Sequence, residues 1–226
     1  MVNVYAVPVP DHLPQEMYER LLNRVCFQKR QQACRFRRRE DSLRTVLGDV
    51  LVRQIVCRTF QIENDRIAFR RNRFGKPFLP DFPRFHFNLS HSGKWVVCAT
   101  SHSRIGIDIE KVESIDLDIA KQFFSNAEYE DLANKPDEEK RASFYEIWTL
   151  KESYIKAVGM GLSLPLQSFA VKTSGSGDIG LYHGLKQVRS WHFRQYDIDV
   201  GYKLAVCSAD SRLSGEIAFL DAADLA

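Results

Sequence analysis

The sequence predicts an α+β fold, because long helical patterns and short strand patterns both occur along the chain. Apolar residues recur at helical spacing over residues 39–60 and 141–158. Short segments of alternating or β-branched residues lie before, between and after these two helices. A length of 226 residues fits either one large domain or two domains of roughly 110 residues.

The first half of the chain predicts a strand, two helices and a hairpin. Residues 2–9 alternate weakly, as in a strand, and residues 14–25 have the spacing of a helix. The long helix 39–60 follows, with its charged residues opposite its apolar face. After a proline-rich loop, a Ser-His-Ser-Gly turn is expected to join two strands, 85–89 and 95–100.

The second half predicts a strand, two helical regions and a set of C-terminal strands. The segment RIGIDIE, residues 104–110, has the pattern of a strand. Residues 116–132 are expected to be helical with an interruption near Ser125, and Gly159 and Gly161 are expected to end the helix 141–158. Three further strands are expected around the glycine-rich turn SGSGDIG: 168–171, 187–197 and 201–209.

A faint internal similarity raises the possibility of two similar halves, 1–103 and 104–226. Three residues of the first long helix correspond in kind to three of the second: Leu47, Asp49 and Arg53 to Leu150, Glu152 and Lys156. Matches this short often arise by chance, so one domain and two halves both remain possible.

Positive charge is concentrated near the N-terminus, although the net charge of the chain is only +3. The basic residues of this stretch are Lys29, Arg30, Arg35, Arg37, Arg38, Arg39 and Arg44. Such a stretch suits an anionic partner, or it is simply a solvated helix face.

The cysteines and the apolar segments indicate the cellular location of the protein. The five cysteines are odd in number, well separated and include no C-x-x-C pair, which indicates reduced thiols. No apolar segment reaches the length of about 18 residues needed to span a bilayer, and the N-terminus has no signal-peptide pattern. We therefore expect a cytoplasmic protein with no membrane partner.

Two neighbouring carboxylates in RIGIDIE form a candidate metal site. Strand alternation sends the three isoleucines to the core and places Asp108 and Glu110 side by side on the other face. Such a pair repels itself unless a cation lies between its members, and hard oxygen ligands suit Mg²⁺, which also binds substrate phosphates. The alternative is an amphipathic strand with a solvated acidic face.

Further polar groups lie on the second long helix and in two predicted turns. Glu152 and Lys156 stand one helical turn apart beside an apolar stripe, so they either complete a phosphate site or form an ordinary surface pair. Ser90 and His91 offer a hydroxyl and an imidazole to a phosphate, or they are structural turn residues. Lys76 follows Gly75 and is either a phosphate ligand or a solvated lysine.

Taken in order, the elements RFGKP, FNLSHSG, IGIDIE and FYEIWTLKESYIKAVGMGL resemble the 4'-phosphopantetheinyl transferases of the Sfp type. The resemblance extends to LGDVLVRQ, FFSNAEY and GYKLAVC, and so covers nearly the whole chain. It implies two similar α+β halves with pseudo-twofold symmetry and an active site in the cleft between them. The pairing of G-I-D-x-E with W-x-x-K-E-x-x-x-K is its most specific part.

The resemblance also implies roles for individual residues. The three carboxylates Asp108, Glu110 and Glu152 would hold Mg²⁺ on the pyrophosphate of coenzyme A, with Lys156 and His91 on its phosphates. Lys76, Ser90 and His91 would line the nucleotide and pyrophosphate pocket. The residues at the 3'-phosphate and adenine end would be Lys29, Arg44 and Thr45.

Two of the implied roles are less direct. Where such enzymes often have a second basic residue three positions after the first, this chain has Gln32, and Arg35 or Arg37 is the candidate substitute. Glu128 is implied as the base that accepts the proton of the attacking serine. The alternatives are a metal-bound water as the base, and Glu128 as an ordinary exposed glutamate on a helix.

The implied reaction is transfer of the phosphopantetheine arm of coenzyme A to a serine of an apo carrier protein, with 3',5'-ADP as the leaving group. The implied partners are peptidyl, acyl and aryl carrier domains of synthetases, as in nonribosomal peptide and antibiotic biosynthesis. The two-halved family pattern implies a monomer, and nucleic acid is not an expected partner.

Two other classes of function are weighed against this one. The basic stretch suits a Mg²⁺-dependent nuclease or a nucleic-acid-binding protein, but that reading leaves the acidic pair and the W-x-x-K-E motif unexplained. A coenzyme A-binding protein without catalysis would show ligand binding and no turnover.

Overall fold

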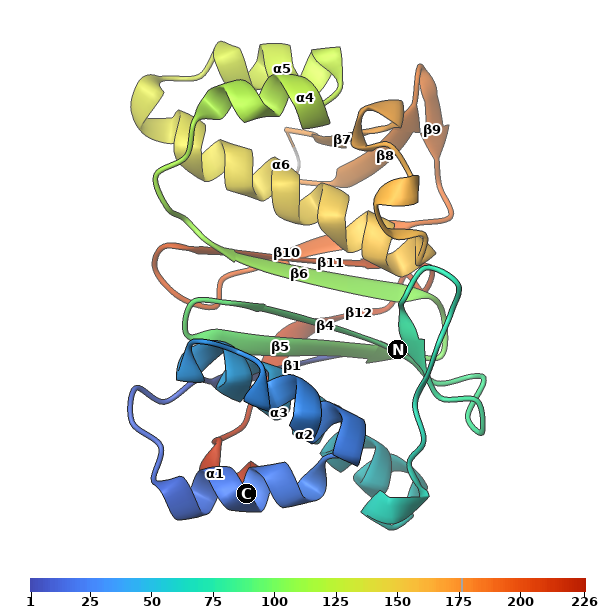
Figure 1. Ribbon diagram of the computed structural model, residues 1–226. Helices are drawn as coiled ribbons and strands as arrows, with labels where there is room; N and C mark the ends of the chain where they lie inside the picture. Colours follow the sequence, from blue (N-terminus) through green and yellow to red (C-terminus); the bar gives the residue numbers. More distant parts are fainter. Residues whose placement is uncertain (176) are drawn as a thin grey trace.

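In the computed structural model, which describes residues 1–175 and 177–226, two sheets lie in the middle of the molecule with helices on both outer sides (Figure 1). The first sheet has the strand order β12-β1-β5-β4, and the second has the order β10-β11-β6. The strands of these sheets are β1 (Val2–Pro8), β4 (His86–Ser92), β5 (Trp95–Ser101), β6 (Ile105–Lys111), β10 (His192–Tyr196), β11 (Tyr202–Ser208) and β12 (Leu213–Phe219).

Each sheet is covered on its outer side by a long helix. Helix α3 (Arg39–Phe60) packs against β5 and β4, and helix α6 (Asp137–Val158) packs against β6 and β11 (Figure 1). The shorter helices are α1 (Gln15–Arg24), α2 (Phe27–Cys34), α4 (Ala120–Phe123) and α5 (Asn126–Ala133). Two small sheets stand apart, one of β2 (Arg70–Arg71) and β3 (Pro77–Phe78), the other of β7 (Ala170–Thr173), β8 (Ile179–His183) and β9 (Lys186–Val188).

The inner faces of the two sheets share one apolar core. Val4 and Val97 of the first sheet belong to the same buried cluster as Ile107 and Val206 of the second. The predicted alternation of RIGIDIE therefore has its expected result, since Ile105, Ile107 and Ile109 are fully buried in this core. Asp108 and Glu110 are left on the opposite face, under α6.

At one edge the two sheets are joined by side chains rather than by a backbone ladder. The N–H of Ile107 donates to Asn88 Oδ1 at 2.8 Å, and the N–H of Lys111 donates to Ser92 Oγ at 3.0 Å. Between them, the N–H of Ile109 donates to Ser90 Oγ at 3.4 Å. We call these three bonds the polar seam. The seam satisfies backbone donors of β6 that would otherwise be buried without a partner.

The α+β class is confirmed, and so are most of the expected elements. The long helix 39–60, the opening strand, the hairpin and the strand RIGIDIE appear where the periodicity predicts them. The interruption near Ser125 is the start of α5, where Ser125 and Glu128 form a reciprocal capping box. Gly159 ends α6 in the left-handed conformation, with φ of 79°.

Three expectations about local structure are wrong. Ser90, His91 and Ser92 lie on strand β4, not in a turn, because β4 pairs with β5 as far as Ser92, which lies opposite Trp95. Helix α6 begins at Asp137, four residues before the expected start at 141, and the expected strand 187–197 is divided into β9 and β10. Ser176 of the expected glycine-rich turn lies outside the described residues.

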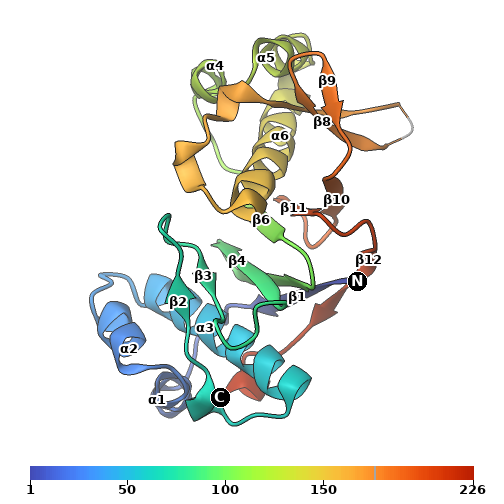
Figure 2. The same cartoon turned by 90° about the vertical axis from the view of Figure 1, so that its right-hand side faces the viewer.

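Five helices and strands of the described residues were not predicted from the sequence. They are α2, which has only a weak apolar periodicity, the two-residue strands β2 and β3, β8, and β12, which pairs in parallel with β1. Strand β12 places residues of the chain's C-terminal part in the first sheet, beside the N-terminus (Figure 2). The expected division at residue 104 falls between β5 and β6. Strand β12, from the second part of the chain, nevertheless pairs with β1 in the sheet of the first part.

Replacing Gly106 with alanine is expected to destabilise the protein by about 3 kcal/mol or more. A methyl group at this position would collide with the backbone of α6 at Ser153 and Ala157, which cannot move without separating α6 from β6. Chemical denaturation measures the effect. Gly48→Ala is the matched control, because its methyl group would lie 3.6 Å from the nearest side chains, in ordinary contact. Equal stability of the two variants would contradict this packing.

Candidate active site

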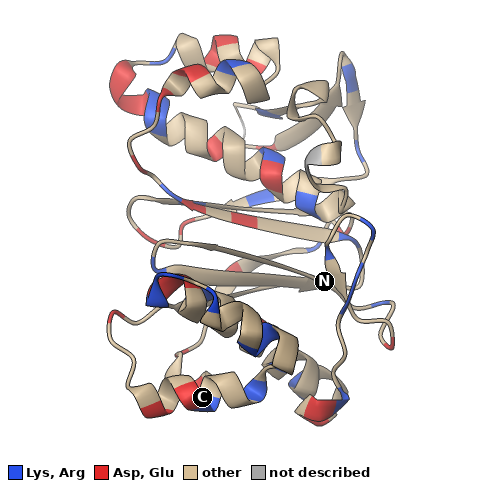
Figure 3. Cartoon of the chain, viewed as in Figure 1, with Lys and Arg blue, Asp and Glu red and all other residues tan. Residues whose placement is uncertain are grey.

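A pocket of about 660 Å³ lies between α2, α3 and β4 on one side and β6 and α6 on the other. Its lining includes most of the residues singled out in the sequence: Lys29, Arg44, Thr45, Ser90, His91, Asp108, Glu110, Glu152 and Lys156. The acidic positions of β6 lie in the middle of the molecule, between basic residues of α3 and the end of α6 (Figure 3). Residues far apart in the sequence are thus brought to one cavity.

Asp108 is the most buried of the three carboxylates, with 2% of its surface exposed. Its Oδ1 accepts from Lys156 Nζ at 2.6 Å and from Ser90 Oγ at 2.9 Å. Its Oδ2 is buried and has no hydrogen-bond partner among the described residues. Burial raises the pKa of Asp108, and the charge of Lys156 opposes that rise. One buried oxygen is therefore available to a ligand.

The surroundings of Glu110 and Glu152 disfavour the charged forms of both carboxyls. Burial, and after it the charge of Asp108, raises the pKa of Glu110 to about 7, although Ser92 Oγ donates to its Oε2 at 2.9 Å. The same two causes raise the pKa of Glu152. The charged forms of these three carboxyls, whose pKa values are all raised in a half-buried pocket, would be stabilised by a cation.

The three carboxylates line the pocket but are not arranged as a complete set of metal ligands. Over residues 1–175 and 177–226, no three His, Cys, Asp or Glu side chains are close enough together to hold a metal ion. The chemistry of the donors nevertheless fits a hard divalent cation, since all three are carboxylates and one buried oxygen of Asp108 lacks a partner. In this arrangement Lys156 supplies the positive charge nearest to Asp108.

Two other groups at the pocket suit an anion. Arg44 is held by Gly93 O and by Asp41, each at 2.6 Å from a guanidinium nitrogen. Burial, followed by the charges of Arg44 and Lys156, lowers the pKa of His91, so its imidazole is neutral near pH 7. A neutral imidazole can donate one hydrogen bond to a phosphate oxygen without adding charge.

Lys76 does not line this pocket. Its Nζ donates to the carbonyls of Ile105 at 2.8 Å and of Lys156 at 2.5 Å, which closes the C-terminal end of α6. Burial lowers its pKa to about 8. Lys76 therefore connects the loop before β3 to β6 and α6, and its ammonium group is already bonded to protein.

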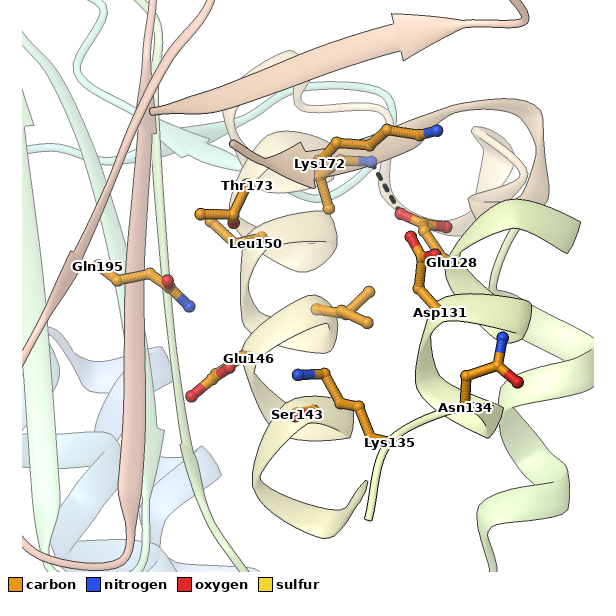
Figure 4. A pocket seen from close by; sticks show the side chains of 12 residues that line it. Glu128, Asp131, Asn134, Lys135, Ser143, Glu146, Leu150, Lys172, Thr173 and Gln195 are labelled. Atoms are coloured by element: carbon orange, nitrogen blue, oxygen red, sulfur yellow. Dashed lines mark hydrogen bonds between the residues drawn. The ribbon is translucent and has the colours of Figure 1, made fainter. Parts of the chain in front are cut away.

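Glu128 also lies away from this pocket. It lines a second cavity of about 470 Å³ with Asp131, Glu146 and Gln195 (Figure 4). Only 1% of its surface is exposed, so the alternative of an ordinary exposed glutamate is wrong. Its carboxylate accepts hydrogen bonds from four groups: Lys151 Nζ, Val171 N–H, Ser125 N–H and Ser125 Oγ. Glu128 therefore ties α5 to α6 and β7.

Sequence reasoning missed two groups that shape the site. Ser92 accepts from the backbone of β6 and donates to Glu110, and its signal was the alternation Asn88, Ser90, Ser92 along one strand. Lys151 is fully buried against Glu128, at 2.6 Å, inside the W-x-x-K-E motif. Helical periodicity alone gave no sign that this lysine has a buried partner.

These features define the class of protein: an enzyme that handles a phosphorylated substrate between buried carboxylates and fixed cations. The chain belongs to the 4'-phosphopantetheinyl transferase superfamily. The sequence model of that superfamily matches residues 104–207, and the model of the N-terminal part of the 4'-phosphopantetheinyl transferases matches residues 13–103.

Individual relatives agree with this assignment. The 4'-phosphopantetheinyl transferase Sfp of Bacillus subtilis (strain 168) is 44% identical over 209 residues, covering 92% of each chain. The transferase gsp of Aneurinibacillus migulanus is 38% identical, covering 95% of this chain and 89% of its own. The human L-aminoadipate-semialdehyde dehydrogenase-phosphopantetheinyl transferase is 32% identical, covering 74% of this chain and 61% of its own.

Among the helices of the described residues, none combines the length and the apolar character that a membrane span requires.

Replacing Glu110 with glutamine is expected to stabilise the metal-free protein at pH 8 and much less at pH 5. A carboxyl whose pKa rises on folding, here from 4.5 to about 7, costs stability as the pH rises above 4.5. The cost is complete above about pH 7, and glutamine removes it. Melting temperatures in EDTA at both pH values measure the gain, with the exposed Glu130→Gln as control. An equal gain in melting temperature at pH 5 and pH 8 would show that folding does not raise the pKa of Glu110.

Proposed function

We propose that the 660 Å³ pocket binds coenzyme A and Mg²⁺, and that the carrier-protein serine attacks there. The chain is a transferase of the 4'-phosphopantetheinyl transferase superfamily, so its reaction moves the phosphopantetheine arm of coenzyme A to a carrier protein. The single observation that carries the site assignment is that Asp108, Glu110, Glu152 and Lys156 line one pocket with the cations of the N-terminal part.

Asp108, Glu110 and Glu152 are the residues that would hold the metal. Bound there, Mg²⁺ would neutralise charge on the diphosphate of coenzyme A. The unpartnered oxygen of Asp108 and the raised pKa values of the other two support this choice. Ser90 and Ser92 fix the carboxylates from β4, so the metal site depends on the polar seam.

Lys156 and His91 act on the phosphate oxygens. Lys156 is half-buried and bonded to Asp108 and Ser90, so a bound diphosphate would add to an ammonium group already fixed in place. In phosphoryl transfer, positioning and charge neutralisation supply most of the catalysis. Lys156 would therefore stabilise charge on the leaving oxygen of 3',5'-ADP.

The serine hydroxyl forms a new bond to the phosphorus that carries the pantetheine arm, and the bond from that phosphorus to the ADP oxygen breaks. The proton of the hydroxyl passes to a base. We assign this role to Glu152, because it lines the pocket and a carboxylate that holds the metal through one oxygen can accept a proton on the other. Glu128, the base implied by family resemblance, is the alternative, although its carboxylate is occupied by Lys151 and Ser125.

The partner is an apo carrier protein of a synthetase, and the chain acts as a monomer in the cytoplasm. Support for the monomer comes from the pocket, whose carboxylates and cations are all supplied by a single chain. Phe123 and Trp148 line the same pocket and stack edge to face, with centroids 5.5 Å apart. They offer an apolar wall for the pantetheine arm or for the carrier residues around its serine.

Transfer is tested with an apo carrier domain, coenzyme A and Mg²⁺, by intact mass of the carrier. Wild type is expected to add the phosphopantetheine arm, and Asp108→Ala and Lys156→Ala are expected to slow the reaction by about 100-fold or more. Asp65→Ala, an exposed residue outside the pocket, is the control. Binding of coenzyme A by wild type with no transfer to any of several carrier domains would contradict the proposal.

Glu128→Gln distinguishes the two candidate bases. Loss of the charge would leave Lys151 buried without its counter-ion, which is expected to cost about 3 kcal/mol of stability. At a temperature where the variant is folded, kcat should stay within about threefold of wild type, a difference below 1 kcal/mol. Asp131→Asn, which faces the same second cavity, is the matched control (Figure 4). A variant of normal stability with a kcat reduced a hundredfold would restore Glu128 as the base.

A further inference from the structure

The end of the pocket away from the carboxylates is lined by two cations from different elements. Lys29 comes from α2 and Arg71 from the two-residue strand β2. With Gln32, they line both the main pocket and an adjoining cavity of about 400 Å³. Arg71 was not among the residues that the sequence singled out.

The two cations have no acidic partner of their own. Among residues 1–175 and 177–226, neither Lys29 nor Arg71 takes part in a salt bridge. Asp49, which lines the adjoining cavity, is paired with Arg53 at 2.6 Å. Burial lowers the pKa of Lys29; the charge of Asp49 opposes this shift, and the positive charge of Arg71 adds to it. Two like charges that face a cavity in this way are stabilised by an anion.

The fold does not itself require a cation at position 71. Arg71 is exposed, and its guanidinium donates to Gly75 O at 2.7 Å across the turn between β2 and β3. That bond fixes the side chain and leaves most of its N–H groups for a ligand. A guanidinium presents paired donors that match two oxygens of one phosphate.

We propose that Arg71, together with Lys29, binds the 3'-phosphate of coenzyme A and so selects coenzyme A over its dephosphorylated form. This inference rests on the proposed function. It assigns the role of the second cation to Arg71 on β2. The sequence had instead suggested Arg35 or Arg37 as the substitute for Gln32. Both of those arginines are exposed, and neither lines either cavity.

The position of Arg71 agrees with the charges of the two ends of the substrate. In the proposed site the diphosphate would lie beside carboxylates, and a metal ion would offset their repulsion. The 3'-phosphate is a monoester with a charge close to −2, which side-chain cations can balance directly. Lys29 and Arg71 supply two positive charges, while Gln32 supplies none. The amide of Gln32 instead accepts from Lys29 Nζ at 3.4 Å and helps to orient it.

The test measures selectivity, because a general loss of folding or catalysis would leave selectivity unchanged. Arg71→Gln is expected to raise KM for coenzyme A about tenfold, as for one lost charged hydrogen-bond pair, and to leave kcat within twofold. KM for dephospho-coenzyme A should stay within twofold of wild type. Arg70→Gln is the matched control, because this exposed neighbour on β2 lines neither cavity. Gln32→Lys in the Arg71→Gln background should recover most of the lost affinity.

Binding of 3',5'-ADP and of 5'-AMP, measured by calorimetry, separates this inference from the proposed function. Arg71→Gln should weaken binding of 3',5'-ADP about tenfold and leave binding of 5'-AMP unchanged. This result would support the role of Arg71 even if wild type transferred nothing to any carrier, an outcome that would contradict only the proposed function. Equal losses for both nucleotides, or no loss for either, would overturn the role of Arg71 even in an active transferase.

Discussion

The arrangement of the site depends on the polar seam between β4 and β6. Side chains at alternate positions of β4 take the place of a backbone ladder, so two sheets meet at an edge without merging into one. The hydroxyls of Ser90 and Ser92 also donate to Asp108 and Glu110. The hydroxyls that accept bonds in the seam therefore also set the direction of the carboxylates, and a change in the seam changes fold and site together.

Charge in the pocket is divided between its two ends. At one end, burial raises the pKa values of Asp108, Glu110 and Glu152, the charge of Asp108 raises those of the two glutamates further, and Lys156 pairs with Asp108. At the other end, Lys29 forms no salt bridge among the described residues, and burial lowers its pKa. A metal-bound diphosphate at the first end and a phosphate at the second would reduce both costs. The substrate thus completes the electrostatics of the folded protein.

Periodicity predicted the α+β class, the two long helices and the face of β6 that carries the carboxylates, because these depend on burial along one element. It failed where a partner distant in sequence decides the outcome. Serines suggested a turn at 90–93, yet pairing with β5 holds residues 90–92 in a strand, where Ser90 and Ser92 reach β6. Lys151 is buried because Glu128 lies opposite it, and Arg71 joins Lys29 only through the fold. Family resemblance gathered most of the site residues, but it did not show that Lys76 caps α6.

A crystal structure with coenzyme A and Mg²⁺ tests the central claim most directly. We expect density for the metal among Asp108, Glu110 and Glu152, with the diphosphate beside Lys156 and both sheets still joined through the seam. Coenzyme A bound elsewhere, or a metal held without any of these carboxylates, would contradict it.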